Sequence, residues 1–291
     1  MMQQITSSQA VILAINSFAL GGLLFLLSAG FSLIFGLMRI PNLMHGAFFM
    51  LGAYFGVSFL NWGMNFWLAA LLSALAMAVI GGIIERFLLR RLEGQVLPQV
   101  LLTLGFAFII ADICLMIWTG DPWQPTPPPE LRGAVQAMGM FFPLYRLVVL
   151  AVAVAVAIAL WVMVDWTRLG AMIRAGVDDP QMASAVGIPV SRLFTMVFCL
   201  GAALAGAGGV IGGPIMSAYP GLDADMLPLA LIVVILGGVG SLLGAFVGAF
   251  ITGFVYTFGV ALFPDLAYVI LFLPMIVVIA FRPRGLFGRA A

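Results

Sequence analysis

Long apolar segments separated by short polar breaks run through almost the whole chain. They lie at about 10–36, 46–60, 66–84, 96–119, 147–164, 193–216 and 266–281. A helix crosses the hydrocarbon core of a bilayer with roughly 20 consecutive apolar residues. The pattern therefore predicts an all-α polytopic membrane protein, in which residues 1–291 form a single transmembrane domain.

One further apolar segment, residues 226–263, is too long for a single crossing. Its middle reads GGVGS, which is typical of a turn. If the segment crosses twice, the chain has nine crossings, with the N-terminus outside and the C-terminus in the cytoplasm. If its first half is only a short broken helix, eight full crossings remain. The pattern thus predicts about 8–9 transmembrane helices.

Arginine positions favour two passes, because cytoplasmic loops of membrane proteins carry an excess of Lys and Arg. Ten of the 12 arginines are then cytoplasmic: they lie at Arg39, in the loop 85–94, in the connection 165–192 and in the tail at Arg282, Arg284 and Arg289. Only Arg132 and Arg146 are then outside, whereas a single pass divides the arginines seven to five.

Composition restricts the functional class. Hydrophobic residues make up 64% of the chain and charged residues 8%, whereas a soluble domain has about 25% charged residues. The excess apolar surface must face lipid, and a net charge of +1 offers no basic face for nucleic acid. A soluble enzyme, a secreted factor and a nucleic-acid-binding module are therefore excluded.

Residue types that several kinds of chemistry require are missing or isolated. The chain has no lysine, which excludes a Walker A nucleotide site and Schiff-base chemistry. His45 is the only histidine, and Cys114 and Cys199 lie far apart in apolar segments. Metal and haem sites of the usual kinds cannot be assembled from these residues. We therefore expect no enzyme activity, no cofactor and no metal in this chain.

Asp112 is the one clear charge inside a predicted span, about two helical turns from the outer end of segment 96–119. Charged residues within a membrane are costly and often functional. Asp112 is either a proton or cation site, or a carboxylate near the interface that pairs with a backbone donor or water. A single isolated carboxylate makes a poor relay, which disfavours ion coupling, although a sodium site built from carbonyls stays open.

Glycine clusters in two apolar stretches, 201–213 and 237–253. Small residues four apart, such as Gly240, Gly244 and Gly248, let helices approach closely. We interpret both stretches as packing surfaces; a sliding interface or a pore face is the alternative.

The longest charged connection, about 165–192, contains a short helix with recognisable ends. Asp179 suits the N-cap, Pro180 the first helical position and Gly187 the position after the C-cap. The residues between them are mostly small and apolar: Met182, Ala183, Ala185 and Val186. Such a helix either inserts as a knob into a groove of a soluble partner or lies in the lipid headgroup region.

Four stretches follow one another along the chain: GFSLIFGLMRIPNLMHGAFFMLGAY from Gly30, RAGVDDPQMASAVGIPVSR from Arg174, GGVGSLLGAFVGA from Gly237 and RPRGLFG from Arg282. Together they resemble the permease subunits of bacterial ABC importers for branched-chain amino acids, over nearly the whole chain. One departure concerns the Glu-Ala-Ala-x-x-x-Gly pattern of many importer permeases. Only Ala183 and Gly187 match it. A contact through that Glu is therefore not carried over.

The resemblance implies the shorter permease of an ATP-driven importer in the bacterial inner membrane. Its partners would be two cytoplasmic ATP-binding subunits, a second and longer permease, a periplasmic substrate-binding protein and the lipid bilayer. The ATP-binding subunits would contact the short helix and its caps: Asp179, Pro180, Gln181, Met182, Ala183, Ser184, Ala185, Val186 and Gly187. Branched-chain amino acids are the first candidate solutes, and the family also carries urea, short amides and aromatic acids. A self-sufficient secondary transporter or channel is the competing hypothesis.

The polar break after the first segment reads N-x-x-H-G and carries Asn42, His45 and Gly46, and the family motif contains both the Asn and the His. We expect Asn42 to cap the second helix and His45 to bind backbone groups freed by Pro41. A place in the transport pathway is the alternative. The sequence identifies no substrate-binding residue.

A periplasmic loop is expected at about 120–144. It contains Trp123 and five prolines before Glu130, and this spacing of prolines makes a chain stiff. The loop either helps to dock the substrate-binding protein or is a rigid connector.

Overall fold

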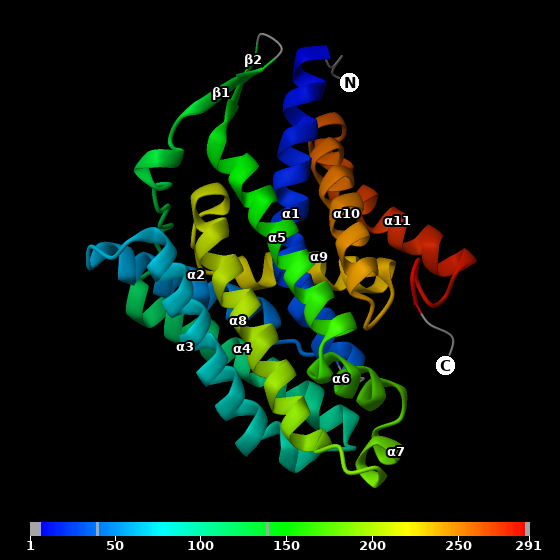
Figure 1. Ribbon diagram of the computed structural model, residues 1–291. Helices are drawn as coiled ribbons and strands as arrows, with labels where there is room; N and C mark the ends of the chain where they lie inside the picture. Colours follow the sequence, from blue (N-terminus) through cyan, green and yellow to red (C-terminus); the bar gives the residue numbers. More distant parts are fainter. Residues whose placement is uncertain (1–6, 39–40, 138–139, 289–291) are drawn as a thin grey trace.

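Six long helices form a bundle in the computed structural model, which describes residues 7–38, 41–137 and 140–288 (Figure 1). They are α1 (Ser7–Met38), α3 (Phe66–Phe87), α4 (Val96–Trp118), α5 (Leu144–Trp166), α8 (Val190–Met216) and α10 (Leu242–Leu262). Each contains a stretch long and apolar enough to cross a membrane. The described chain is thus a helical, multi-pass membrane protein, as predicted. Arg39 and Arg289, two of the arginines predicted to be cytoplasmic, lie outside the described residues.

Three further apolar helices are shorter: α2 (His45–Asn61), α9 (Leu222–Gly237) and α11 (Ala267–Phe281). The long apolar segment is divided between α9 and α10, as predicted. The break falls in GGVGS, where Gly238 and Gly240 have φ angles of 103° and 77°. α9 has 16 residues, fewer than the roughly 20 of a full crossing. Its length fits the short broken helix that the sequence left as an alternative.

Short elements connect the long helices. At the lower end of Figure 1, α6 (Arg168–Asp178) and α7 (Pro180–Ala185) join α5 to α8. The remaining short helices are η1 (Leu89–Leu92), η2 (Pro129–Leu131) and η3 (Pro264–Leu266). At the upper end, β1 (Ala134–Ala137) and β2 (Met140–Pro143) form an antiparallel hairpin with Ala134 opposite Pro143. The sequence did not predict this hairpin, because strands of four residues carry too little alternation to recognise.

Of the six long helices, α8 is the most deeply buried, and α1, α2 and α3 pack around it. Glycine pairs bring these backbones into contact. A methyl group added at Gly52 would lie 2.4 Å from Cα of Gly206, and one added at Gly30 would lie 2.7 Å from Cα of Gly201. The stretch 201–213 is therefore a packing surface, as predicted.

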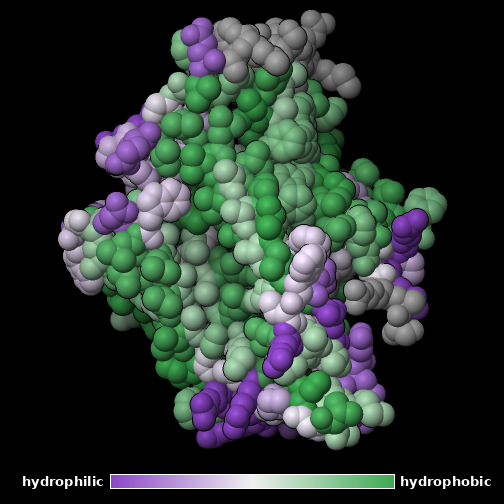
Figure 2. Space-filling model, viewed as in Figure 1, coloured by the Kyte–Doolittle hydropathy of each residue, from purple (hydrophilic) through white to green (hydrophobic). Residues whose placement is uncertain are grey.

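In contrast, α4 and α5 bury least of their length. Figure 2 shows a surface that is apolar over much of the height of the bundle, with hydrophilic residues at its lower end and in smaller groups along its upper left edge and right side. Large exposed apolar side chains on these helices include Phe108, Met116, Ile158 and Trp161. Such faces suit contact with lipid or with another membrane protein.

Candidate functional site

The N-terminal end of α7 has the cap that the sequence predicts. Asp179 Oδ1 accepts hydrogen bonds from the backbone N–H groups of Gln181 (2.9 Å) and Met182 (3.0 Å). Pro180 is the first residue of the helix, where its fixed φ angle and missing N–H are both compatible with helix geometry.

The C-terminal end of α7 is a Schellman motif. The N–H of Gly187 donates to the carbonyl of Ser184, and the N–H of Ile188 donates to the carbonyl of Ala183, both at 3.0 Å. The motif requires a left-handed residue, and Gly187 supplies it with a φ angle of 89°. Both ends of this six-residue helix are therefore fixed by its own sequence.

α7 directs Ala183 inward and most of its other side chains outward. Met182 is 61% exposed and Val186, which caps the helix, is 70% exposed, whereas Ala183 is only 3% exposed. Ala183 therefore supports α7 against the rest of the chain, and it is not part of an exposed apolar knob. The exposed surface of α7 and its C-cap consists of Gln181, Met182, Ser184, Ala185 and Val186.

The adjoining helix α6 was missed by the sequence reasoning. Its buried residues are Gly170, Ile173 and Gly176, spaced three apart on one face. A methyl group added at Gly176 would lie 3.2 Å from both Leu37 of α1 and Leu193 of α8. α6 therefore ties the connection 165–192 to the ends of two long helices. The spacing of small and apolar residues was the available signal, although charged neighbours obscured it.

Asn42, His45 and Gly46 meet two other helices at the start of α2. Asn42 Oδ1 accepts a hydrogen bond from the N–H of Met44 at 3.2 Å. The N-cap of α2 is Met44, without a side-chain cap bond, so the prediction that Asn42 caps this helix is wrong: Asn42 stabilises the turn before it. His45 Nε2 lies 2.9 Å from the carbonyl oxygen of Leu27 in α1, so its partner is not a group freed by Pro41. A methyl group at Gly46 would lie 2.5 Å from the carbonyl oxygen of Asp223 in α9.

These three residues are enclosed by the protein. Asn42 is 3% exposed, His45 is 0% exposed and Gly46 is also buried. The ring of His45 lies 5.2 Å from that of Phe31, between ring centroids. The arrangement joins α1, α2 and α9, which favours the structural interpretation of the N-x-x-H-G motif over contact with a solute.

Asp112 lies on the exposed surface of α4. Its neighbours along that surface, Phe108 and Met116, are 63% and 83% exposed. Among the described residues, no hydrogen bond or ion pair joins Asp112 to another side chain. The carboxylate therefore faces the surroundings of the chain, and no described residue offers it a second charge with which to form a relay.

A cavity of about 500 Å³ lies between the turn joining α2 to α3 and the Pro-rich loop. The loop is held in place by Trp123, whose backbone pairs with that of Ala218 at 2.8 and 2.7 Å. Gln124 Nε2 also donates to the carbonyl of Pro214 at 3.2 Å. The walls contain both apolar and polar groups, including Glu130 and Arg132.

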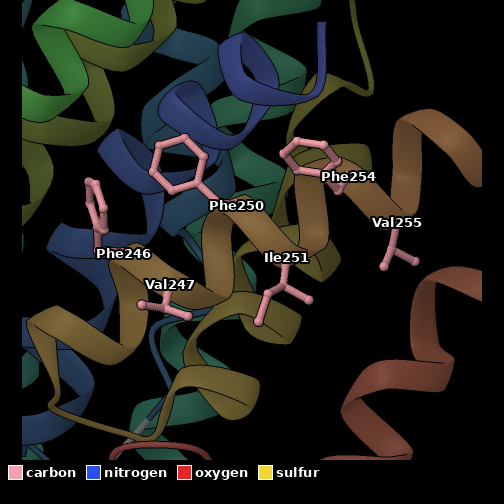
Figure 3. A pocket seen from close by; sticks show the side chains of 6 residues that line it. All are labelled: Phe246, Val247, Phe250, Ile251, Phe254 and Val255. Carbon is pink, nitrogen blue, oxygen red and sulfur yellow. The ribbon is translucent and has the colours of Figure 1, made fainter. Parts of the chain in front are cut away.

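A second hollow, of about 470 Å³, lies along α10 and is lined by six apolar residues. Figure 3 shows the three phenylalanines Phe246, Phe250 and Phe254 on one side of the helix, and Val247, Ile251 and Val255 on another. These side chains carry no hydrogen-bonding group. The hollow suits a lipid chain and offers nothing to orient the charged groups of an amino acid.

Comparisons with known proteins identify relatives along nearly the whole chain. Residues 13–279 match the family described as "Branched-chain amino acid transport system / permease component". The high-affinity branched-chain amino acid transport system permease protein BraD of Pseudomonas aeruginosa is 26% identical over 290 residues, with 94% of each chain covered. The corresponding permease LivH of Escherichia coli K12 is 26% identical over 300 residues, again with 94% of each chain covered.

A more distant relative comes from Methanocaldococcus jannaschii. Its probable branched-chain amino acid transport permease protein LivH is 25% identical over 235 residues, with 77% of this chain and 72% of the relative covered. No solved structure gives a significant match.

Proposed function

Because the chain belongs to the family of permease components of branched-chain amino acid transport systems, we propose that it carries branched-chain amino acids or similar small solutes. The chain is a permease subunit of an importer, and the match over residues 13–279 is the observation that carries the proposal. The named solute of the relatives from Pseudomonas aeruginosa and Escherichia coli supports this choice.

In this proposal ATP is hydrolysed by partner proteins. Two ATP-binding subunits work from the cytoplasm, a second and longer permease completes the pathway, and a periplasmic protein delivers the solute. The absence of lysine supports ATP hydrolysis by separate subunits, because a Walker A site needs that residue. The exposed apolar faces of α4 and α5 support the presence of a membrane partner beside the surrounding lipid.

The proposed orientation has the N-terminus outside and the C-terminus in the cytoplasm of a cell with a bacterial inner membrane. Two contacts support it. Gly240, in the break between α9 and α10, lies against Gly36 near the end of α1. The N–H of Leu286 in the tail donates to the carbonyl of Leu236 at 2.9 Å. The tail, the break and the end of α1 therefore share one side, together with α6, which agrees with the positive-inside rule.

We also propose that the region Asp179–Gly187 is the contact through which the ATP-binding subunits act. A partner can drive a conformational change only through contacts that differ between the two states. The exposed side chains of Met182 and Val186 on a doubly capped helix support this role. Ala183, whose side chain faces inward, would hold the helix rigidly to the chain during the movement.

The competing function is a secondary transporter that works alone, and Asp112 is the observation in its favour. Its exposed position without a charged partner among the described residues makes ion coupling less favourable. The decisive measurement is leucine uptake into proteoliposomes that contain either the purified chain alone or the complex purified with its second permease and ATP-binding subunits, each supplied with the substrate-binding protein outside. Uptake should require the complex and internal ATP. Uptake by the chain alone would overturn the proposal.

The contact region can be tested in the same assay. Val186→Glu should reduce both copurification of the ATP-binding subunits and uptake, because a charge would enter the contact. Val239→Glu is the matched control, since Val239 is also exposed, at 45%, but lies in the break between α9 and α10. Equal behaviour of the two variants would contradict the assignment to α7 and favour a helix that only lies on the membrane surface.

A further inference from the structure

One arginine joins three elements near α7. Arg90 lies in η1, and its Nη2 donates to the carbonyl of Ser191 at 2.6 Å and to Thr195 Oγ1 at 2.5 Å. The same nitrogen is 3.6 Å from Glu85 Oε2. Glu85 belongs to the last turn of α3, whereas Ser191 and Thr195 belong to the first turns of α8. A single guanidinium group therefore connects α3, η1 and the start of α8.

The carboxylate in this group is buried. Glu85 is 1% exposed, and a buried charge is unfavourable unless it is paired. The second ion pair found among the described residues, between Arg174 and Asp165, has side chains that are 33% and 44% exposed. In the pair of Glu85 with Arg90 the carboxylate is held away from solvent, whereas the side chain of Arg90, at 31% exposed, is open to solvent about as much as that of Arg174.

η1 also contacts α4. Gln99 Nε2 in the first turn of α4 donates to the carbonyl of Leu89 at 3.2 Å. The side chain of Leu89 is 2% exposed, and that of Gln99 is 3% exposed. η1 is thus fixed to α4 on one side and, through Arg90, to α8 on the other.

The position of Ser191 links this junction to α7. α7 ends at Ala185, and α8 begins at Val190. Only the tight turn 186–189 separates the two helices, and the N–H of Val190 donates to the carbonyl of Ile188 at 2.8 Å. A displacement of α7 therefore reaches the first turn of α8 through very few residues.

We propose that Arg90 is a positioning residue that transmits the movement of α7 to α3 and α4. It does so by holding the first turn of α8 against η1, so that the ends of the three long helices move as one body. The inference rests on the proposed function, in which ATP-binding subunits move α7. Because α4 exposes most of its length, its displacement changes a surface available to the second permease.

The chemistry of arginine suits this task. Its planar guanidinium group offers several donors in fixed directions, and here one end reaches a carboxylate, a carbonyl and a hydroxyl group. Arg91, the next residue, is exposed. The structure gives Arg91 no side-chain hydrogen bond or ion pair with any described residue, so it provides a matched control with the same charge in the same short helix.

The test uses the complete transporter in proteoliposomes and measures leucine taken up and ATP hydrolysed. Arg90→Met should leave the ATP-binding subunits bound and hydrolysis active, but raise the ATP used per leucine by about tenfold, the scale expected for lost hydrogen bonds to a charged group. Arg91→Met should keep the wild-type ratio. A wild-type ratio in Arg90→Met would overturn the inference.

A purely structural role, in which Arg90 only neutralises Glu85, makes a different prediction. The double variant Glu85→Gln/Arg90→Met removes both charges, so it should recover a normal ratio if neutralisation is the whole role. Our proposal expects the double variant to stay uncoupled, because the bonds to α8 are still missing; recovery would overturn it. If these variants do not assemble, Thr195→Val, which keeps the ion pair, should raise the ratio, and an unchanged ratio would overturn the proposal.

The failure of this inference is distinguishable from the failure of the proposed function. If the wild-type complex shows no ATP-dependent uptake, or if Val186→Glu behaves as Val239→Glu, the proposed function or the α7 contact fails. If those measurements succeed and Arg90→Met keeps the wild-type ratio, only the role of Arg90 is wrong.

Discussion

Gly52 lies where α2 crosses α8, and a methyl group has no room there. It would approach Cα of Gly206 to 2.4 Å and the carbonyl oxygen of Gly206 to 2.7 Å. Both contacts are with backbone, which cannot move aside as a flexible side chain can. We expect Gly52→Ala to lower the free energy of unfolding by roughly 1–3 kcal/mol, as overpacking does elsewhere.

Gly105 of α4 is the control for that substitution, because nothing lies within 4 Å of a methyl group added there. Ala favours helix over Gly by about 1 kcal/mol, so Gly105→Ala should keep or raise stability. Thermal unfolding of the purified protein in detergent measures the stability of the two variants. Equal midpoints for the two variants would contradict the close helix crossing.

Asp112→Asn should leave uptake within about twofold of wild type, because a single carboxylate without a charged partner makes a poor proton relay. The side chain is exposed on α4 and has no charged partner among the described residues. Uptake is measured at matched amounts of permease in the membrane. Loss of uptake at normal abundance would bring back the ion-coupled function.

At the scale of elements, the N-cap of α7 gives a prediction with a close control. Asp179→Ala removes the acceptor of two backbone N–H groups, which costs about 1 kcal/mol in other helices. Amide hydrogen exchange in residues 181–186 should therefore become about fivefold faster. Asp178→Ala, one residue earlier at the exposed end of α6, removes the same charge without removing the cap. Equal exchange in both variants would mean that the cap does not hold α7.

α7 also explains which parts of the molecule the sequence could predict. Its cap, its first proline and its final glycine act within nine residues, so their meaning is visible in the sequence. The break in the segment 226–263 was predicted for the same reason, since GGVGS is a local signal. Elements with weak local signals, such as α6 and the β1–β2 hairpin, were not predicted.

Contacts between distant residues were beyond the sequence reasoning. The partner of His45 is Leu27, 18 residues earlier, and the partner of Arg90 is Ser191, 101 residues later. Nothing in a single sequence specifies such pairs. The burial of Ala183 could not be predicted for the same reason, because it depends on how α7 packs against the rest of the chain. The apolar composition of α7 alone does not distinguish its inner face from its outer face.

At the scale of the whole molecule, the packing of glycines joins the ends of distant helices. Gly36 and Gly240 touch, and Gly176 lies against Leu37 and Leu193. The end of α1, the break between α9 and α10, and the start of α8 therefore belong to one side of the bundle. This side also carries η1 and α7, which explains why the arginine-rich segments can share one compartment although they are spread over the chain.

The orientation of the whole molecule gives the last prediction. We expect an impermeant maleimide to label Thr126→Cys in intact cells, and to label Arg284→Cys and Val239→Cys only after the membrane is opened. All three positions are exposed in the structure, so differences in labelling report the side of the membrane rather than burial. The background needs Cys114 and Cys199 replaced, since both are free.

Val239 makes this test informative about α9. The hydrogen bond from the N–H of Leu286 to the carbonyl of Leu236 holds the tail beside the break, so Arg284 and Val239 must respond together whichever side they are on. If both are labelled only in opened cells, the segment 226–263 turns back at GGVGS and the C-terminus is cytoplasmic. If both react in intact cells while Thr126→Cys does not, the orientation is reversed. Labelling of Val239→Cys alone in intact cells would contradict the packing of the tail against the break.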